Sequence, residues 1–386
     1  MKRSTDRVLT THTGSLPRPD DLLELSRQAR EGAVDPSQLA QRTKEAVDDV
    51  VRRQVACGVD VPSDGEFSKP SYATYVHYRL SGFEGEGERN VRMTDLDEFP
   101  AYGEMLVARR LGTRARPGEN TVAPPACVGD IAVKDRSALE ADIENLRQAG
   151  AAARPEELFM SSASPGVIAL FFANHHYPTR EAYVGAIAEA MREEYEAIAA
   201  AGFILQLDCP DLAMGRHFQF GDLGLEEFRR EAWVNMEALN HATSAIDPDQ
   251  MRIHLCWGNY EGPHHKDVPL ADILDVALAA RANGISIEAA NPRHEHEWAI
   301  FEEVALPEGK VLIPGVIDST NNYIEHPELV AQRLRRYVNL VGQENVLAGT
   351  DCGFGTAAQI STVHPDIAWA KLESLAEGAR RASAKG

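Results

Sequence analysis

The chain has 386 residues, of which 44% are hydrophobic and 25% are charged, a balance typical of a soluble globular protein. Its net charge of -20 argues against nucleic acid and anionic membranes as partners, because their phosphate groups would repel it. The sequence contains no apolar run long enough to suggest a membrane span.

The start of the chain and its cysteines indicate a cytoplasmic protein. The opening residues MKRSTDRVLTTHTG lack the apolar core of a secretory signal. Cysteines are too few and too scattered for a disulfide scaffold: Cys57, Cys127, Cys209, Cys256 and Cys352. We therefore expect a reducing, cytoplasmic environment in which some thiols are free to bind metal or to react.

Eight β-rich runs alternate with longer stretches of helical periodicity. The predicted strands are 8–15, 59–66, 158–165, 203–210, 251–258, 285–291, 311–318 and 345–353, with a further short strand near 165–175. The predicted helices are 37–57, 179–201, 224–242, 269–282, 295–304, 326–341 and 367–382. Glycine-bearing helix ends such as AAGFILQ and RANGISIE lead into several strands, as in parallel β/α units. Eight strands in this alternation predict an α/β fold of the (β/α)₈ TIM barrel type, with a doubly wound open sheet as the structural rival.

Residues 67–135 do not follow this alternation. They mix aromatic, glycine and proline residues and have no helical period. We interpret them as an insertion after the second strand, with its own short strand near 126–133, that covers one mouth of the barrel. Residues 1–386 would then form a single catalytic domain.

Polar side chains collect at the carboxyl ends of the predicted strands. They are His12, Ser15, Asp64, Glu66, Asp208, His254, Cys256, Glu288, Asp318, Asp351 and Cys352. An acid at one strand end commonly caps the next helix. Polar ends on so many strands instead indicate one shared pocket, because active sites of (β/α)₈ barrels lie at the carboxyl ends of the strands.

One strand places an imidazole next to a thiol. In RIHLCWGNY, His254 and Cys256 are separated by one residue and would point to the same face of a strand. Zinc binds imidazole, thiolate and carboxylate, so Cys352 and Glu288 could complete a four-ligand site. Paired thiolates favour zinc over magnesium or calcium. A buried cysteine can also be simply a small hydrophobic residue, so this spacing alone leaves the metal site open.

The ordered motifs THTGSLPRP, DGE, LQLDCP, HLCWGN, IEAAN, PGVID and DCGF resemble those of the catalytic half of cobalamin-independent methionine synthase. The likeness runs from about residue 8 to residue 356, which is nearly the whole chain. The resemblance implies a (β/α)₈ barrel and a Zn²⁺ ion held by His254, Cys256, Glu288 and Cys352. It also implies a small thiol such as homocysteine as acceptor and methyltetrahydrofolate as methyl donor.

The resemblance further implies roles for the other strand-end residues. Zinc would lower the pKa of a substrate thiol and favour the nucleophilic thiolate. Ser15, Glu66 and Asp208 match amino-acid-binding positions of the family, and two carboxylates suit an ammonium group. We expect His12 to bind substrate beside them, and Glu66, Asp208 and Asp318 to be catalytic.

Three departures from the family pattern concern the donor. Thr320, in PGVIDSTNN, stands where the family has a proton-transferring histidine, and threonine cannot act as a general acid near neutral pH. The family's folate-stacking tryptophan falls on SPGVIALFFANHH, where Phe171 or Phe172 offers a ring. DCGFGT lacks the basic residue that follows the cysteine motif in the synthase. A donor other than folate therefore remains open.

The leading hypothesis is a zinc-dependent transferase that moves a methyl or other alkyl group onto a thiol. Its rival is a C–S lyase or an epoxide-opening thiol transferase of the epoxyalkane:coenzyme M type, which needs no folate site. The four ligand positions argue against a metal-free barrel like uroporphyrinogen decarboxylase. A glutamate ligand at a barrel mouth argues against purely structural zinc. The oligomeric state, including a homo-oligomer, is left open.

Several other polar or aromatic residues have two interpretations. His264, His265, His294 and His296 would lie on loops at the same mouth, in contact with substrate or with solvent. Tyr72, Tyr75 and His77 would pack the insertion or line the site, and Arg216 and His217 would contact an anion.

Overall fold

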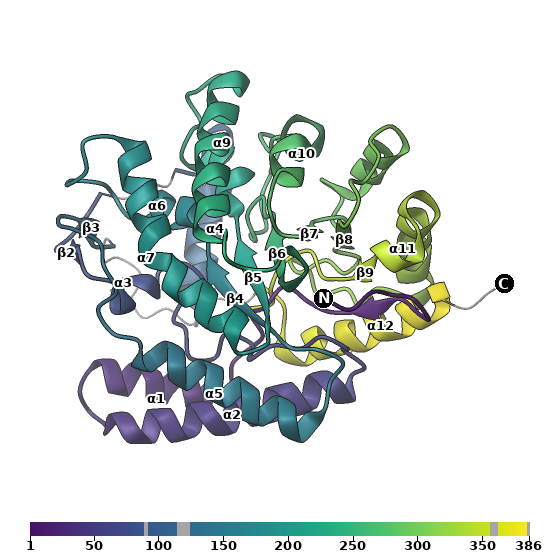
Figure 1. Cartoon of the computed structure of the whole chain (residues 1–386), viewed down its shortest axis with the longest axis horizontal. Helices are drawn as coiled ribbons and strands as arrows, with labels where there is room; N and C mark the ends of the chain where they lie inside the picture. The colour runs from purple at the N-terminus through teal and green to yellow at the C-terminus, as the bar shows by residue number, and fades with distance from the viewer. Residues whose placement is uncertain (89–91, 114–123, 356–361, 384–386) are drawn as a thin grey trace.

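The computed structural model describes residues 1–88, 92–113, 124–355 and 362–383. At its centre lies a parallel five-stranded sheet in the order β4-β5-β6-β7-β8, with helices packed around it (Figure 1). Its strands are β4 (Phe159–Ala163), β5 (Ile204–Asp208), β6 (Met251–His254), β7 (Gly284–Ile287) and β8 (Val311–Pro314). Strands that are neighbours in the sheet also follow one another in the chain, as in repeated β/α units. The predicted α/β alternation with a parallel sheet is confirmed.

Further parallel pairings continue from this sheet. Backbone bridges join β8 to the region of β9 (Leu347–Ala348), which pairs in parallel with β1 (Leu9–Thr10). Thr11 then bridges to Val61, which lies in the predicted second strand. The carbonyl of Pro62 accepts a hydrogen bond from Phe159 N–H, at the start of β4. Each segment predicted as a main strand thus takes part in this succession of pairings.

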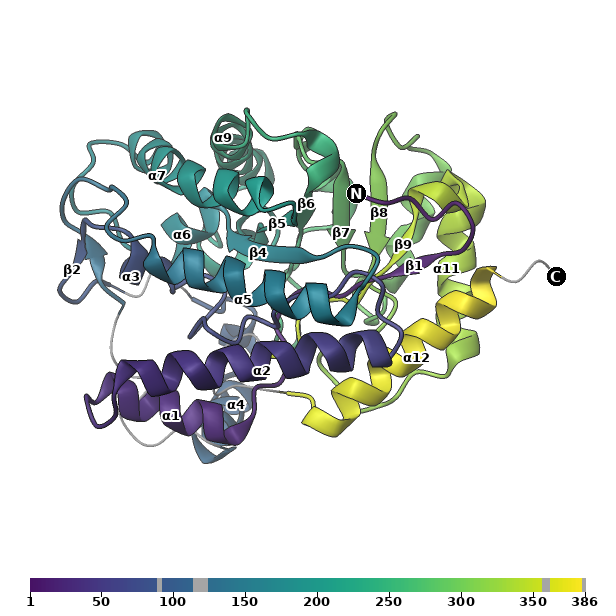
Figure 2. The same cartoon turned by 60° about the horizontal axis from the view of Figure 1, so that its bottom comes forward.

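Helices occupy the connections and lie outside the strands (Figures 1 and 2). Asp35 caps α2 by accepting a hydrogen bond from Ser37 N–H, and Thr179 caps α7 through Ala182 N–H. Helices α1 and α5 both pack against α2 (Figure 2). The long helices are α1 (Asp20–Arg30), α2 (Pro36–Ala56), α5 (Ser137–Ala153), α7 (Arg180–Ala200), α9 (Leu225–Ala242), α10 (Leu270–Leu278), α11 (Pro327–Val341) and α12 (Pro365–Ser383).

Two predicted elements differ in the structure. The segment near 165–175 is the helix α6 (Pro165–Phe171) and not a strand. Ser164 accepts a hydrogen bond from Val167 N–H and Pro165 occupies the first helical position, so local capping starts a helix there. The segment predicted as helix 295–304 is the 3₁₀ helix η4 (Glu295–Glu302).

Short elements also lie in the connections that follow β5, α9 and α11. They are η2 (Pro210–Leu212), α8 (Gly215–Phe218), η3 (Pro248–Gln250) and η5 (Gln343–Asn345).

The segment after the second predicted strand was expected to have no helical period, but the structure places a 14-residue α-helix in it beside several shorter elements. It holds α3 (Val76–Arg79), β2 (Phe83–Glu84), η1 (Leu96–Glu98), α4 (Pro100–Thr113) and β3 (Ala126–Cys127). The strand expected near 126–133 is confirmed in β3, which pairs antiparallel with β2. Residues 89–91 and 114–123 of the predicted insertion lie outside the described part of the chain. Hydrogen bonds from Arg92 N–H to Phe218 O and from Tyr102 Oη to Glu261 O hold this segment against the loops that follow β5 and β6.

The strands of the sheet bury many apolar side chains and also one cation, Arg252. Leu205, Ile253 and Ile285 are fully buried strand residues. Arg252 is also buried, and it donates hydrogen bonds to Gln206, Thr11 and the carbonyl of His12 while its guanidinium lies 3.8 Å from the ring centre of Phe159. These partners satisfy a charge that would otherwise be costly to bury.

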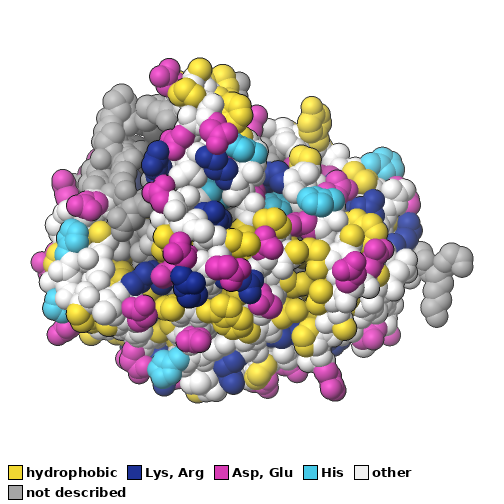
Figure 3. All heavy atoms as spheres, turned by 90° about the horizontal axis from the view of Figure 1, so that it is seen from above, with side chains coloured by type: hydrophobic (Ala, Val, Ile, Leu, Met, Phe, Trp, Pro, Cys, Tyr) yellow, Lys and Arg dark blue, Asp and Glu magenta, His cyan; other side chains and the backbone are white. Residues whose placement is uncertain are grey.

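Acidic and basic side chains are interspersed with apolar ones over the face seen in Figure 3. Among the helices that the structure describes, none combines the length and apolar character needed to cross a membrane.

Candidate metal and active site

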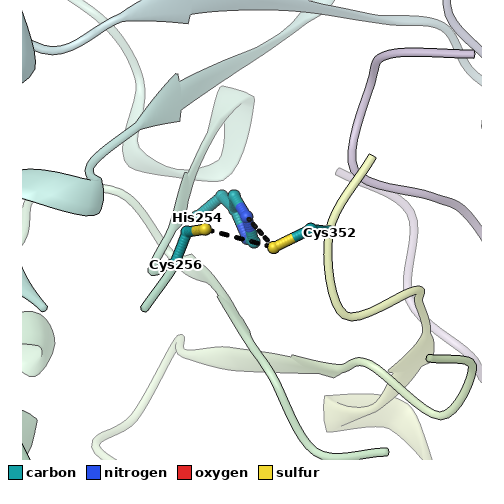
Figure 4. A group of neighbouring side chains, drawn as sticks. All are labelled: His254, Cys256 and Cys352. Atoms are coloured by element: carbon teal, nitrogen blue, oxygen red, sulfur yellow. Dashed lines mark hydrogen bonds between the residues drawn. The ribbon is translucent and has the colours of Figure 1, made fainter. Parts of the chain in front are cut away.

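Two thiols and an imidazole meet where β6 and β9 end. His254 is the last residue of β6, Cys256 lies two residues further on, and Cys352 follows β9. The two Sγ atoms are 3.2 Å apart, and Cys352 Sγ is 3.6 Å from His254 Nε2 (Figure 4). Ligand atoms of the three residues all lie within 4.8 Å of one another. Three of the four residues expected to bind zinc therefore lie together in the structure.

Glu288 borders this group from the end of β7. Its Oε1 lies 3.5 Å from Cys352 Sγ and accepts a hydrogen bond from Trp257 N–H. Its Oε2 accepts hydrogen bonds from Asn291 Nδ2 and from Arg293 Nη2, at 2.8 and 2.7 Å. The carboxylate therefore lies close enough to Cys352 to act as a fourth ligand. Its position is fixed by hydrogen bonds from Trp257 N–H, Asn291 and Arg293.

The charge state of these groups follows from their burial. Burial and the neighbouring Cys256 raise the pKa of the Cys352 thiol well above its usual value. Burial lowers the pKa of His254 to about 4, so its imidazole is neutral near pH 7. Burial opposes ionisation of Glu288, but the adjacent Arg293 and His294 outweigh it and lower its pKa. Without a cation, burial therefore favours a protonated Cys352, a neutral His254 imidazole and an ionised Glu288 carboxylate.

The donor set fits a zinc ion. Tetrahedral zinc with bonds of about 2.0–2.3 Å places nitrogen and sulfur ligands roughly 3.5–3.8 Å apart. The His254–Cys352 separation falls in this range, and the two sulfurs would move apart by about 0.6 Å from their 3.2 Å separation. His254 Nδ1 is buried and has no hydrogen-bond partner in the described part of the chain. Soft sulfur ligands with an imidazole select zinc over hard cations.

A cavity of about 220 Å³ opens beside the thiols. Ser15, Glu66 and Asp208 line its polar end, next to His254, Cys256 and Cys352. The rest of the lining is mostly apolar and includes Tyr72, Met93, Phe171, Pro210, Met214, Phe218 and Tyr260, together with the polar Thr13 and Asn259. The cavity therefore presents carboxylates and a hydroxyl close to the sulfurs, and an apolar wall further away.

Glu66 and Asp208 form a carboxylate pair at the polar end. Glu66 Oε1 accepts a hydrogen bond from Ser161 Oγ, whereas its buried Oε2 has no partner among the described residues. Asp208 Oδ1 accepts a hydrogen bond from Gln206 Nε2. Burial raises the pKa of both carboxyls, and the proximity of Glu66 raises that of Asp208 further. A cationic group between the two carboxylates would lower both pKa values and favour their ionised forms.

The backbone at Glu66 has a φ of 62°, which is unfavourable for a residue other than glycine. Such strain persists only where the surrounding structure holds it. Here Glu66 N–H donates to Asp64 Oδ1 and its carbonyl accepts from Arg18 Nη2. These contacts turn the Glu66 carboxylate into the cavity.

Ser15 lies beside a close approach of two backbone segments. Its Oγ accepts a hydrogen bond from Gly355 N–H at 3.3 Å. A Cβ at Gly353 would lie 2.0 Å from Ser15 Oγ, so only glycine fits there. This contact brings the loop that carries Cys352 against the polar end of the cavity.

His12 and Asp318 are buried but do not line the cavity. His12 Nε2 contacts Gln54 Oε1, and its Nδ1 accepts Gly14 N–H. Asp318 accepts hydrogen bonds from Thr320 and Asn321, and its backbone carbonyl accepts from the buried Lys371. The backbone N–H and the hydroxyl of Thr320 therefore both donate to Asp318 within the loop after β8.

The aromatic and histidine residues noted in the sequence lie in three places: the cavity wall, the protein interior and the surface. Phe171 faces the cavity, whereas Phe172 is fully buried beside Phe83. His264 and His294 are buried rather than solvated, whereas His265 is exposed and contacts Glu98. The sequence did not predict five residues of the cavity wall, namely Met93, Met214, Phe218, Asn259 and Tyr260. Only their position after β5 and β6, or in the insertion, could have pointed to them.

Comparisons with known proteins agree with this arrangement. The profile of the family described as "Cobalamin-independent synthase, Catalytic domain" matches residues 8–94 and 105–368. A methionine synthase of Saccharolobus solfataricus is 25% identical over 374 residues, covering 96% of this chain and 93% of the relative. A methionine synthase of Sulfolobus acidocaldarius is 24% identical over 371 residues, covering 96% and 90%.

Two solved structures share the fold. A B12-independent methionine synthase from Shewanella sp. W3-18-1, in complex with selenomethionine, superposes with a TM-score of 0.71 at 20% identity, covering 97% of both chains. A putative vitamin-B12 independent methionine synthase from Listeria monocytogenes gives a TM-score of 0.65 at 16% identity, covering 97% of this chain and 98% of that one.

Proposed function

Because the chain belongs to the family of the cobalamin-independent synthase catalytic domain, a family of methionine-synthase-like methyltransferases, we propose that it is a zinc-dependent thiol alkyltransferase. Its acceptor would be homocysteine or a related small amino thiol. The group transferred would be a methyl or another alkyl group.

The observation that carries this proposal is the approach of His254, Cys256 and Cys352 beside the cavity. These residues would hold the zinc ion, with Glu288 as the fourth protein donor. When bound, zinc would lower the pKa of the acceptor thiol and keep its sulfur nucleophilic at neutral pH. Trp257 N–H, Asn291 and Arg293 hold the Glu288 carboxylate in place beside Cys352.

The polar end of the cavity would bind the amino-acid part of the acceptor. Glu66 Oε2 is buried without a partner in the described part of the chain, and it belongs to a carboxylate pair whose pKa values are raised. An ammonium group would supply the missing positive charge and charge-assisted hydrogen bonds. Ser15 Oγ lines the same end and would bind the carboxylate of the acceptor. Both groups would orient the thiol toward the metal ligands.

His12 and Asp318 would act through other residues rather than on substrate. The His12 ring holds Gly14 N–H and packs at 5.1 Å from the ring of Phe159. Asp318 would shape the loop after β8 through Thr320 and Asn321. We therefore propose Glu66 and Asp208 as the carboxylates that contact substrate, with His12 and Asp318 as positioning residues.

We further propose that the succession of strand pairings is a closed (β/α)₈ barrel and that the chain is one catalytic domain. The hydrogen bond between Phe159 and Pro62 supports closure, because it links β4 to the second predicted strand. The insertion at 67–135 would cap the cavity. Two residues of this segment, Tyr72 and Met93, line the cavity. A third, Asp95, accepts a hydrogen bond from Oη of the wall residue Tyr260.

Epoxide opening or C–S cleavage on the same zinc site is the second candidate. It is favoured by the apolar wall of Phe171, Met214 and Phe218, which suits a neutral alkyl donor. It is also favoured by Thr320, whose hydroxyl is bonded to Asp318 where the resemblance places a proton-transferring histidine.

The proposal is tested by incubating the zinc-loaded protein with homocysteine and either methyltetrahydrofolate or an alkyl epoxide, with products followed by mass spectrometry. Alkylation of homocysteine sulfur that requires Cys256 and Cys352 would support the transferase. Methylation from the folate would identify the synthase reaction, and a hydroxyalkyl thioether would identify the second candidate. Failure to alkylate any of several amino thiols by zinc-loaded protein would contradict the proposal.

A further inference from the structure

A second group of metal-ligating side chains is buried outside the thiol site. His217 belongs to α8, whereas His264 and Asp267 lie between β6 and α10. Their ligand atoms lie within 4.8 Å of one another, and His217 and His264 are 1% and 4% exposed. We propose that His217, His264 and Asp267 bind a second divalent transition-metal ion, such as zinc or cobalt.

The surroundings of His264 call for a positive charge at its Nδ1 nitrogen. Its Nε2 lies 3.0 Å from the carbonyl oxygen of Tyr260, which can only accept, so Nε2 carries a hydrogen. Its Nδ1 lies 3.1 Å from both oxygens of Asp267. A nitrogen lone pair this close to a carboxylate would be repelled, so either a second proton or a metal ion lies there. The carbonyl contact at Nε2 is the arrangement that typically orients a metal-binding histidine.

His217 provides the independent observation that favours a metal ion over a proton. Neither of its ring nitrogens has a hydrogen-bond partner in the described part of the chain, although both are buried. Leaving such polar atoms unsatisfied is costly. His217 Nδ1 lies 3.4 Å from Asp267 Oδ1 and therefore faces the same point as His264 Nδ1. A proton on His264 would leave His217 Nδ1 without a partner, whereas a metal ion would bind the Nδ1 atoms of both histidines.

The separations match the size of such an ion. A tetrahedral ion with bonds of about 2.0–2.1 Å holds its nitrogen and oxygen ligands roughly 3.3 Å apart. The observed nitrogen–oxygen separations are 3.1 Å for His264 and 3.4 Å for His217. Imidazole and carboxylate donors suit zinc, cobalt or nickel better than magnesium or calcium.

The charges around the group leave Asp267 available to an ion. His294 Nε2 and Arg293 Nη1 approach Asp267 Oδ2 at 3.1 and 3.4 Å. Each of these cationic neighbours has a closer carboxylate of its own. Arg293 pairs with Glu288 at 2.7 Å, and His294 pairs with Glu297 at 2.8 Å. These two contacts are to Oδ2, so Oδ1 is left to the histidines, at 3.1 Å from His264 Nδ1 and 3.4 Å from His217 Nδ1.

An ion at this position would cross-link two loops that form the cavity wall. His217 precedes the wall residue Phe218, and the ring of His264 lies 4.0 Å from that of the wall residue Tyr260. The insertion at 67–135 contacts the same loop, because its Asp95 accepts hydrogen bonds from Tyr260 Oη and from His264 N–H. The expected role of the ion is therefore to hold the apolar wall and this insertion together.

The test measures cobalt binding to the doubly substituted Cys256→Ser, Cys352→Ser chain. We expect one equivalent of cobalt(II) to bind with d–d absorption but without a sulfur-to-cobalt charge-transfer band, and to raise the melting temperature. Adding His217→Ala or Asp267→Asn should abolish both effects. Adding His265→Ala is the matched control, because this exposed neighbour contacts Glu98 and should leave binding unchanged.

The same comparison in the otherwise unaltered chain covers the case in which the double variant does not fold. There, His217→Ala should bind one equivalent of cobalt less than His265→Ala and retain the charge-transfer band of the thiol site. Equal cobalt content in these two variants would overturn the proposal, as would a folded Cys256→Ser, Cys352→Ser chain that binds no cobalt. Loss of the charge-transfer band alone would instead bear on the proposed zinc site.

Discussion

The Sγ atoms of Cys256 and Cys352 lie 3.2 Å apart although 96 positions separate the residues in the chain. Burial raises the pKa of Cys352, so the pair is unfavourable as thiolates unless a cation is present. A bound zinc ion would stabilise the two thiolates, because thiolates are preferred ligands of zinc.

Cys352→Ser should lower zinc affinity by at least about 100-fold, because loss of a ligand costs more than the 10- to 100-fold cost of losing an outer contact. Zinc content after dialysis against a competing chelator measures the effect. Cys57→Ser is the matched control, since Cys57 lies at the other end of the strands, near Glu373. Equal zinc retention by the two variants would argue that the thiols do not bind the ion.

Arg293→Met should weaken zinc binding by about 10-fold by releasing the Glu288 carboxylate. The guanidinium lies 2.7 Å from Glu288 and contributes to lowering its pKa, so the substitution should also shift zinc binding to higher pH. A chelator titration at several pH values measures both changes. Arg293→Lys should retain part of the effect through its charge, and a variant with unchanged affinity would show that Glu288 needs no such support.

Glu66→Gln and Asp208→Asn should each lower kcat/KM for an amino thiol by about 10- to 100-fold, the value of a charge-assisted hydrogen bond. A thiol of the same length without the amino group provides the control in the same variants. Its turnover should change little, because it offers no ammonium group to the carboxylate pair. A similar loss for both thiols would instead indicate that the carboxylates act on the reacting atoms or on the fold.

The His12 imidazole should remain neutral down to pH 5. Its Nδ1 accepts Gly14 N–H and its Nε2 contacts Gln54, so a second proton would displace the Gly14 contact. Burial lowers its pKa from 6.5 to about 3 in the folded chain. The unfolded chain therefore binds the proton first, and acidification below 6.5 should reduce the free energy of unfolding by up to about 1.4 kcal/mol per pH unit.

Nitrogen NMR of labelled histidines between pH 8 and 5 checks this directly. The His12 signals should stay those of the neutral ring over this whole range. Titration of His12 near its ordinary pKa would contradict the buried, hydrogen-bonded role.

The strand positions and the His254–Cys256 pair were predictable because both are local in origin, whereas Glu288 and Cys352 were assigned to the ligand set through the family resemblance. His254 and Cys256 share one strand end, and the carboxyl ends of parallel strands meet at one edge. The helix α6 was missed because the apolar run VIALFFA is compatible with a strand or a helix. Ser164 and Pro165 at the start of this run are a local helix-start signal that could have decided between them, and Ser164 caps α6 in the structure.

Roles that depend on distant partners were not predictable. The ring of His12 is held by Gln54, which lies 42 positions away. The group of His217, His264 and Asp267 arises only because the loops after β5 and β6 are adjacent. In the sequence these residues are separate loop positions, and no periodicity connects them.

The most direct test of the account is an anomalous-difference map from crystals of the purified protein, measured on both sides of the zinc absorption edge. We predict a peak present only above the edge and within bonding distance of His254, Cys256 and Cys352. A map without density between these side chains, from zinc-supplemented protein, would contradict the central claim.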